Sequence, residues 1–463
     1  MRGRAHRVLF AAGLSAALCL VPLALNAQPD TSDAVSLAPV VFSDRTLSNG
    51  LRVLLIEDHS SPTVAIHVGY HVGGKDDPPG RSGFAHLFEH LMFKGTANTE
   101  PETLDRLTED VGGFNNAYTA EDLTGYFEVV PSNYLETLLW AEADRLRSLN
   151  VDATNFKTER DVVLGEYGQV VLSQPYGMLY FSLLDGRSYT RHPYRRGVIG
   201  TPAELKAATL TDVQRFHATH YRPDNATLVV AGDFDPAEAS SWIDRYFGEI
   251  PKPPGPRVQV AVREPAQKRE RRFTYYAANV PLPAVAFTYH ATSLASPDAT
   301  VLQVIENILS SGESARLYRT LVYTQQLAAA VTADADLREQ PGIFTVVAIL
   351  NAGKKTQTAY KALDTEINKL QTTLVGEAEL EKARTQLVSD LVRGREENED
   401  RALELVRTTI LMGDPNLVNR RLADIQSVSA ADVQRVARKY LRQANRTVIN
   451  YLPGAMKPRA RTR

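Results

Sequence analysis

The stretch GFAHLFEHLMFKGT, residues 83–96, contains two histidines, His86 and His90, one helical turn apart. On a helix this spacing places both imidazoles on one face, where they can reach the same metal ion. Glu89 lies on that face as well, and it can take a proton from a metal-bound water without being a ligand itself. The pattern H-x-x-E-H therefore predicts amide-bond hydrolysis, with the order of the commoner H-E-x-x-H motif reversed.

The apolar neighbours of the two histidines support a metal site over a chance match. A lone histidine is usually a surface or capping residue, and a five-residue pattern can arise by chance. Here Leu87, Phe88 and Leu91 predict a segment that is buried on most sides. Polar groups in such a segment cost a few kcal/mol each when they lack partners. A zinc ion would satisfy both histidines at once.

The first residues resemble a secretory signal. Arg2, Arg4 and Arg7 precede an apolar run over residues 8–25, and Ala27 ends a stretch of the kind that signal peptidase recognises. We expect residues 1–27 to be a signal peptide, cleaved after about Ala27, and the protein to be exported to the periplasm of a bacterial envelope. An uncleaved membrane anchor is the alternative, but the run is borderline in length for one and is interrupted by proline.

The only cysteine, Cys19, lies inside this signal segment. The mature chain would therefore contain no thiolate, and its zinc ligands would have to be histidines or carboxylates. The formal net charge is −2, and it becomes more negative without the signal arginines. Nothing in this balance suggests nucleic acid, and no second apolar run suggests a membrane span.

A proline-rich stretch near the middle of the chain divides it into two halves. We read residues 251–262 as a stiff interdomain linker that starts with PKPPGP. It separates an N-terminal zinc-binding catalytic domain, residues 28–250, from a C-terminal homologous domain, residues 263–455. Residues 456–463 would form a basic tail.

The two halves share an internal repeat. The tetrapeptide at residues 212–215, DVQR, returns at residues 432–435, and the Asn-x-Thr at residues 225–227 returns at the same offset at residues 445–447. Two separate matches at one offset indicate a duplication.

The second copy of the repeat lacks the metal ligands. Gln303, Glu306 and Asn307 stand where His86, Glu89 and His90 stand in the first copy. Only the first half should therefore bind zinc.

Within each half, apolar strands alternate with amphipathic helices. Residues 52–57 and 63–70 look like a strand pair, the metal helix follows from about Gly83 to Phe93, and residues 124–130 form another strand. The sequence predicts an α+β fold of two homologous domains, each a mostly antiparallel sheet with helices packed on one face.

A third protein ligand is needed to complete a tetrahedral zinc site that keeps one position for water. A predicted helix over residues 155–169 offers Glu159, Asp161 and Glu166. Glu159 and Glu166 share a face, two turns apart. Spacing alone leaves the choice open, because glutamates in such positions are usually solvated.

Several further motifs give the chain a resemblance to a known family. They are the H-x-x-E-H motif, the text ERDVVLGEYGQV at residues 159–170, and GFNNAYT at residues 113–119, together with HPY at residues 192–194 and YRPDN at residues 221–225. With these the mature chain resembles the pitrilysin and insulinase zinc peptidases, the inverzincins. It looks most like the beta subunit of mitochondrial processing peptidase and its short bacterial two-domain relatives.

The resemblance implies a role for each site residue. His86, His90 and Glu166 would bind one Zn²⁺ per chain, and Glu159 would contact a ligand histidine and orient its ring without binding the metal itself. Glu89 would be the catalytic general base. Asn116 and Ala117 would bind the substrate by presenting a sheet edge to an extended peptide. The implied activity is zinc-dependent endopeptidase cleavage of short or unfolded peptides in an enclosed chamber.

One departure from the family bears on partners. Many relatives carry in the second half an Arg and, further on, a Tyr that reach the substrate, and here Val322 and Ala329 stand at those places. A second related subunit would then supply the Arg and Tyr, in a heterodimer or heterotetramer, or else the chain would act as a homodimer. A dedicated peptide maturase and a non-catalytic scaffold subunit are the alternative functions.

Overall fold

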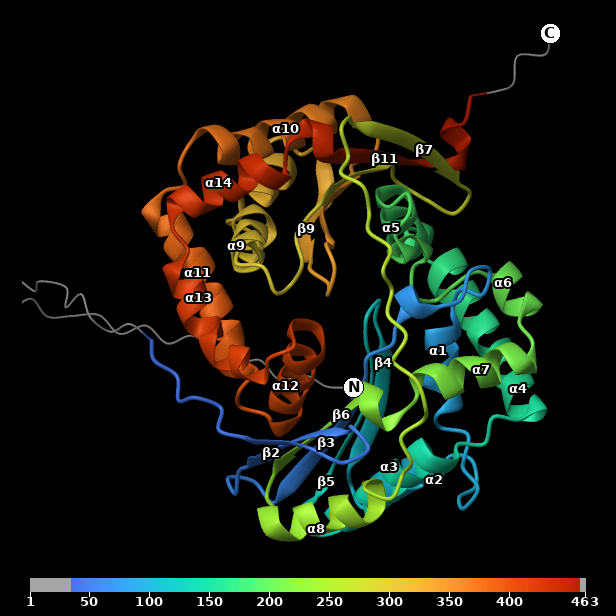
Figure 1. Ribbon diagram of the computed structural model, residues 1–463. Coiled ribbons are helices and arrows are strands. Elements are labelled where there is room, and N and C mark those ends of the chain that lie inside the picture. Colours follow the sequence, from blue (N-terminus) through green and yellow to red (C-terminus); the bar gives the residue numbers. More distant parts are fainter. Residues whose placement is uncertain (1–34, 459–463) are drawn as a thin grey trace, which may run out of the picture. The chain divides into compact units, whose positions relative to one another are not determined.

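Two β-sheets form from the apolar segments of the two halves (Figure 1). The first is six-stranded, in the order β1-β2-β6-β3-β5-β4, and the second is five-stranded, in the order β7-β11-β8-β10-β9. The strands are β1 (Ser43–Thr46), β2 (Arg52–Glu57), β3 (Thr63–Tyr70), β4 (Phe114–Thr119), β5 (Thr124–Pro131), β6 (Ala226–Gly232), β7 (Arg271–Ala277), β8 (Ala284–His290), β9 (Ala328–Asp336), β10 (Ile343–Leu350) and β11 (Arg446–Pro453).

The helices follow the same division into halves. Those of the first half are α1 (Phe84–Leu91), α2 (Thr103–Glu109), α3 (Leu135–Ser148), α4 (Ala153–Glu166), α5 (Leu184–Ser188), α6 (Pro202–Ala207), α7 (Leu210–His220) and α8 (Pro236–Phe247). Those of the second half are α9 (Asp298–Ser310), α10 (Thr356–Thr372), α11 (Glu377–Arg393), α12 (Asn398–Met412), α13 (Arg421–Ser427) and α14 (Ala430–Tyr440). Three π-helical segments add to these: η3 (Tyr167–Ser173), η4 (Leu179–Leu183) and η7 (Tyr318–Thr324).

This computed structural model describes residues 35–458. The predicted signal peptide, with Cys19 and the cleavage site after Ala27, lies outside the described residues, as do residues 459–463 of the predicted basic tail. Among residues 35–458, no helix combines the length and the apolar character needed to cross a membrane.

The two sheets have the same strand order once β1 is set aside. Each contains one parallel pair, β2 with β6 in the first sheet and β11 with β7 in the second, and its other pairs are antiparallel. The α+β class with mostly antiparallel sheets is therefore confirmed. The shared order also agrees with the internal repeat in the sequence.

The predicted pairing of residues 52–57 with residues 63–70 is wrong. Both segments are strands with those bounds, but β6 lies between them and pairs with each. The reason lies in β6 itself, because every one of its residues is buried. An apolar strand of this kind is most stable in the middle of a sheet, where both of its edges are hydrogen-bonded and both of its faces are covered.

Each sheet carries its main core on one face. In the first half α1, α3, α7 and α8 pack there, with β-strand residues such as Ile66 and Val230 fully buried beneath them. In the second half α9, α10, α11 and α14 pack around Phe287 and Val346 in the same way. Helices packed on one face of each sheet are what the sequence predicts.

The opposite face of each sheet is covered by a helix from the other half. Helix α12 packs on β3 and β6 of the first sheet, where Val406 contacts the apolar residues of those strands (Figure 1). The first half returns a helical segment, η4 with α5, whose Leu179 packs against the second sheet. The two halves thus exchange helices, and the apolar cluster on this opposite face of each sheet contains residues from both halves.

Candidate metal centre

Helix α1 begins directly after Gly83, whose backbone has a conformation that few other residues adopt. Gly83 has φ +91°, a left-handed conformation that favours glycine. The buried carboxylate of Asp77 accepts hydrogen bonds from Gly83 N (2.6 Å) and Ala85 N (2.9 Å), two of the free amides at the helix start. The apolar face of the helix, with Phe84 and Phe88, is fully buried in the first core. These contacts fix the helix that carries the two histidines.

Helix α4 places a carboxylate opposite those histidines. It begins at Asp152, whose side chain accepts from the amides of Thr154 and Asn155, and its last residue is Glu166. The chain continues beyond Glu166 as the π-helix η3, whereas the sequence predicts one regular helix to Gln169. Short π-helical segments are often found at functional sites.

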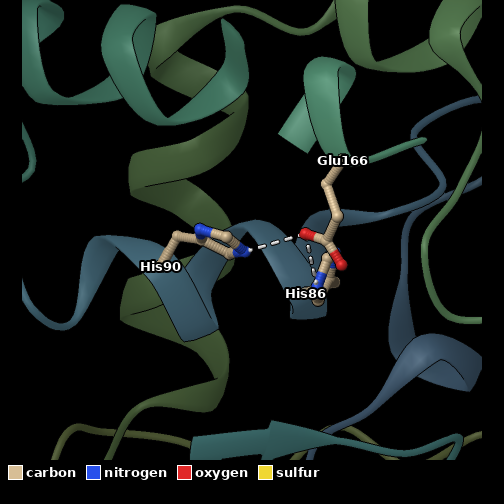
Figure 2. A group of neighbouring side chains, drawn as sticks. All are labelled: His86, His90 and Glu166. Carbon is tan, nitrogen blue, oxygen red and sulfur yellow. Dashed lines mark ion pairs between the residues drawn. The ribbon is translucent and has the colours of Figure 1, made fainter. Parts of the chain in front are cut away.

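The three predicted ligands meet at one point (Figure 2). Glu166 Oε2 lies 3.5 Å from His86 Nε2 and 3.4 Å from His90 Nε2. One ligand atom from each residue can be chosen so that all three lie within 4.8 Å of one another. A tetrahedral zinc ion with bonds of about 2.0–2.2 Å holds its ligand atoms about 3.3–3.6 Å apart. The distances from the carboxylate to the two imidazoles therefore fit zinc.

Glu159 lies behind His90 rather than with the ligands. Its Oε2 is 3.6 Å from His90 Nδ1, the ring nitrogen that faces away from Glu166, and its Oε1 is 3.4 Å from Lys94 Nζ. The carboxylate is buried, so it needs these positive partners. From this position it can orient the His90 ring. No role for Lys94 follows from the sequence pattern, because the contact depends on how α1 and α4 pack.

Glu89 is held by a residue of the neighbouring strand. Thr119, the last residue of β4, donates a hydrogen bond from its Oγ1 to Glu89 Oε2 at 2.6 Å. Glu89 does not belong to the group of three ligands. It lies close enough to His90 and Glu166 for their charges to affect its pKa.

Asn116 and Ala117 lie on the same strand, β4, at the end of the first sheet. Among the described strands β4 pairs only with β5, so its other edge is open. Thr119 is missing from the residues that the sequence indicates as functional, although it closes the GFNNAYT motif. Its contact with Glu89 depends on the packing of α1 against β4, which the sequence does not reveal.

The electrostatics of the site favour a cation between the ligands. Burial lowers the pKa of His86 to about 4. Burial acts on His90 in the same direction, but the carboxylates of Glu159 and Glu166 outweigh it and raise the pKa of His90 to about 9. Burial also raises the pKa of Glu89, and the hydrogen bond from Thr119 opposes that shift. The carboxylates of Glu159 and Glu166 therefore stabilise positive charge at this point, and a divalent metal ion bound between the ligands would provide that charge.

The second half keeps the geometry of this region without its ligands. Gln303, Glu306 and Asn307 lie on α9, where Glu306 accepts a hydrogen bond from Ala335 N of β9 and Asn307 donates to the Gln303 carbonyl. Within residues 35–458, His86, His90 and Glu166 are the only group of three or more histidine, cysteine or carboxylate side chains close enough to hold one metal ion.

The places of the missing Arg and Tyr also lie in the second half. Val322 packs against the second core and Ala329 is exposed on β9. The nearby Tyr323 is 78% exposed.

Comparison with known proteins places the chain in a family. The sequence model described as "Insulinase (Peptidase family M16)" matches residues 52–201, and "Peptidase M16 inactive domain" matches residues 207–387. The zinc protease PqqE of Helicobacter pylori is 27% identical over 410 residues, which cover 88% of this chain and 92% of that protein. A probable mitochondrial-processing peptidase subunit beta of Arabidopsis thaliana is 28% identical over 404 residues, 86% of this chain and 75% of that one.

Solved structures give the same result. The crystal structure of a protease from Helicobacter pylori superposes with a TM-score of 0.85 at 27% identity, over 89% of this chain and all of that one. Pitrilysin has a TM-score of 0.69 at 16% identity, which shows the fold alone. The two family matches lie side by side and together span most of residues 52–387, with the ligand set in the first and none in the second. The chain belongs to the insulinase family of zinc peptidases, peptidase family M16.

Proposed function

We propose that this chain is the metal-bearing subunit of a zinc-dependent endopeptidase that cleaves short or unfolded peptides. The observation that carries the proposal is the meeting of His86, His90 and Glu166 at distances that fit one zinc ion, with Glu89 beside them. A scaffold subunit would need neither this set nor a hydrogen-bonded carboxylate next to it. Zinc protease names among the relatives point the same way.

The residues divide the chemistry between them. One zinc ion, held by His86, His90 and Glu166, would supply a Lewis acid that polarises the scissile carbonyl and acidifies the attacking water. Glu89 accepts the proton of that water and passes it to the leaving amine. Thr119 keeps one oxygen of Glu89 engaged, which limits the orientations of the carboxylate.

In this proposal the substrate binds at the open edge of β4. An extended peptide can add to this edge as a further strand, with backbone hydrogen bonds at Asn116 and Ala117 that demand little of its sequence. Thr119 and thus Glu89 lie at the end of the same strand. A peptide bound there must be extended, so folded proteins should be poor substrates.

We infer that a second, related subunit completes the enzyme. Support comes from Val322 and Ala329, which offer no polar group at the places where relatives carry the Arg and Tyr. The Arabidopsis relative is named as a beta subunit of a larger peptidase. A chamber would then form between two two-domain chains in the periplasm, after removal of the signal at Ala27. A homodimer is the competing assembly, and isolation of this chain alone and fully active from the native periplasm would rule out the heteromer.

The test is hydrolysis of a quenched fluorescent peptide of intermediate length by the mature chain. Turnover that stops with a chelator, returns with zinc and is absent in Glu89→Gln would support a self-sufficient peptidase. Absence of turnover with zinc bound would mean that the site needs its partner, and the assay would be repeated with the co-purified subunit. Chelator-insensitive turnover, or full activity in Glu89→Gln, would refute the proposal.

A further inference from the structure

A cavity of about 840 Å³ lies where the two halves meet the linker. Its walls include His71 and Asn225 from the first half, His290 and Asn445 from the second, and residues between 257 and 266, which belong to the linker and to the segment directly after it. None of the metal ligands, and neither Glu89 nor Glu159, lines it. Its volume is in the range of sites that bind small molecules, which run to about 1,000 Å³.

The linker spans this cavity because it is tied to the protein at separated points. Arg222 donates to two linker carbonyls, Pro253 O at 3.0 Å and Gly255 O at 2.9 Å, and Gln340 donates to Val260 O at 3.1 Å. Just after the linker, Glu264 accepts hydrogen bonds from the backbone amides of residues 190–192. Linker residues between these ties line the cavity rather than fill it.

The carboxylates in the cavity wall are already engaged. Besides Glu264, Glu339 accepts from His71 Nε2 at 2.9 Å and from Lys75 Nζ. Asp76 accepts from Gly73 N at 3.0 Å. These acidic groups have internal donors, so they offer little to attract a cation into the cavity.

Three arginines in the same wall are free. Within residues 35–458, the side chains of Arg257, Arg263 and Arg442 make no ion pair and no hydrogen bond, and all three are exposed where they line the cavity. Each guanidinium presents a planar fork of donors that matches a carboxylate or a phosphate. The cavity therefore carries uncompensated positive charge contributed by the linker and by the second half.

The internal repeat shows why Arg442 is free. Arg442 stands in the second copy where Arg222 stands in the first. Arg222 is buried and paired with Asp224, with Nη2 3.0 Å from Oδ2. The second copy has Ala444 in place of Asp224, so the arginine has been kept while its carboxylate partner has been lost.

We propose that this cavity binds a small organic anion that carries several phosphate or carboxylate groups, held by Arg257, Arg263 and Arg442. The ligand would occupy with its oxygens the place that Asp224 occupies beside Arg222. It would join the linker to the second half, and by binding only the folded chain it would raise the melting temperature. This inference does not depend on peptidase activity.

The test is isothermal titration calorimetry of the mature chain with pyrophosphate and with citrate, at physiological ionic strength. The titrations are run with zinc removed and again with zinc restored, because both probes also bind zinc. We expect saturable binding with equal affinity in the two states, and a rise in melting temperature. Tighter binding of pyrophosphate would indicate that the site recognises phosphate groups, and tighter binding of citrate would indicate that it recognises carboxylate groups.

Variants then locate the binding. Arg442→Ala should weaken it about tenfold, since one charged hydrogen-bonding group is lost. Ala444→Asp should weaken it similarly while keeping the arginine, by restoring the partner that Arg222 has. Arg215→Ala, which removes an exposed and unpaired arginine away from the cavity, should bind as the parent does. No binding by the parent chain, binding only with zinc present, or equal affinity in all variants would overturn the proposal.

Discussion

Replacing Thr119 with valine tests whether the hydrogen bond to Glu89 matters for catalysis. Valine has nearly the shape of threonine and lacks the hydroxyl that donates to Glu89 Oε2 at 2.6 Å. Hydrogen bonds to charged groups contribute about 1.5–3 kcal/mol. If this bond holds the carboxylate in its productive orientation, its loss should lower kcat about 10–150-fold. The effect should stay below that of Glu89→Gln, which removes the base itself.

The assay is steady-state hydrolysis of the quenched peptide, with zinc content measured on the same samples. We expect an unchanged zinc content, because Thr119 is not among the ligand group, and a KM close to that of the parent chain. Thr119→Ser keeps the hydroxyl and should recover most of kcat. An undiminished kcat in Thr119→Val, or a serine variant as slow as the valine one, would refute the positioning role.

Three further predictions concern zinc binding and stability. Glu159→Gln should weaken zinc binding about 10–100-fold, because His90 loses the carboxylate beside its Nδ1. The zinc affinity is measured by competition with a chelator. An affinity equal to that of the parent chain would show that Glu159 does not support the site. Burial lowers the pKa of His217 to about 4, so below pH 6.5 the unfolded chain gains a proton that the folded chain does not, and stability falls by about 1.4 kcal/mol per pH unit. Between pH 6.5 and pH 5, the free energy of unfolding of His217→Phe, measured with urea, should therefore fall by about 2 kcal/mol less than that of the parent chain. An equal fall in both proteins would contradict this. Gly69→Ala should destabilise by about 1–3 kcal/mol, since a Cβ there would lie 2.3 Å from Val406 Cγ1 of α12, and an unchanged melting temperature would show that the helix can shift.

The parts of the site that come from one helix could be predicted from spacing. His86, Glu89 and His90 share a helical face because of the helix period alone, and the structure places them on α1 as expected. Glu166 could not be chosen over Glu159 in this way, since both lie on α4 and only the packing of α4 against α1 separates their positions. The resemblance to the family, rather than periodicity, indicates Glu166.

The fold class could also be predicted from patterns within short stretches of the sequence. Strand and helix bounds follow from apolar patterns, and the bounds of β2 and β3 agree with the prediction. Their predicted pairing is wrong because these two strands are neighbours in the chain but not in the sheet. The strand that separates them, β6, comes more than a hundred residues later in the sequence. Nothing in the apolar pattern of β2 or β3 indicates that β6 lies between them in the sheet.

The exchange of helices between the halves limits how the chain can be divided. If α12 were removed with the second half, the first sheet would expose Leu54 and Val229, which are fully buried in the intact chain. Neither half should then be obtained as a stable fragment on its own. A cut within the exposed linker, by contrast, should leave the two pieces held together by the helices that each has placed in the other. A protease that nicks this loop would produce a two-chain protein with its metal centre intact, and co-expressed halves should find each other by complementation.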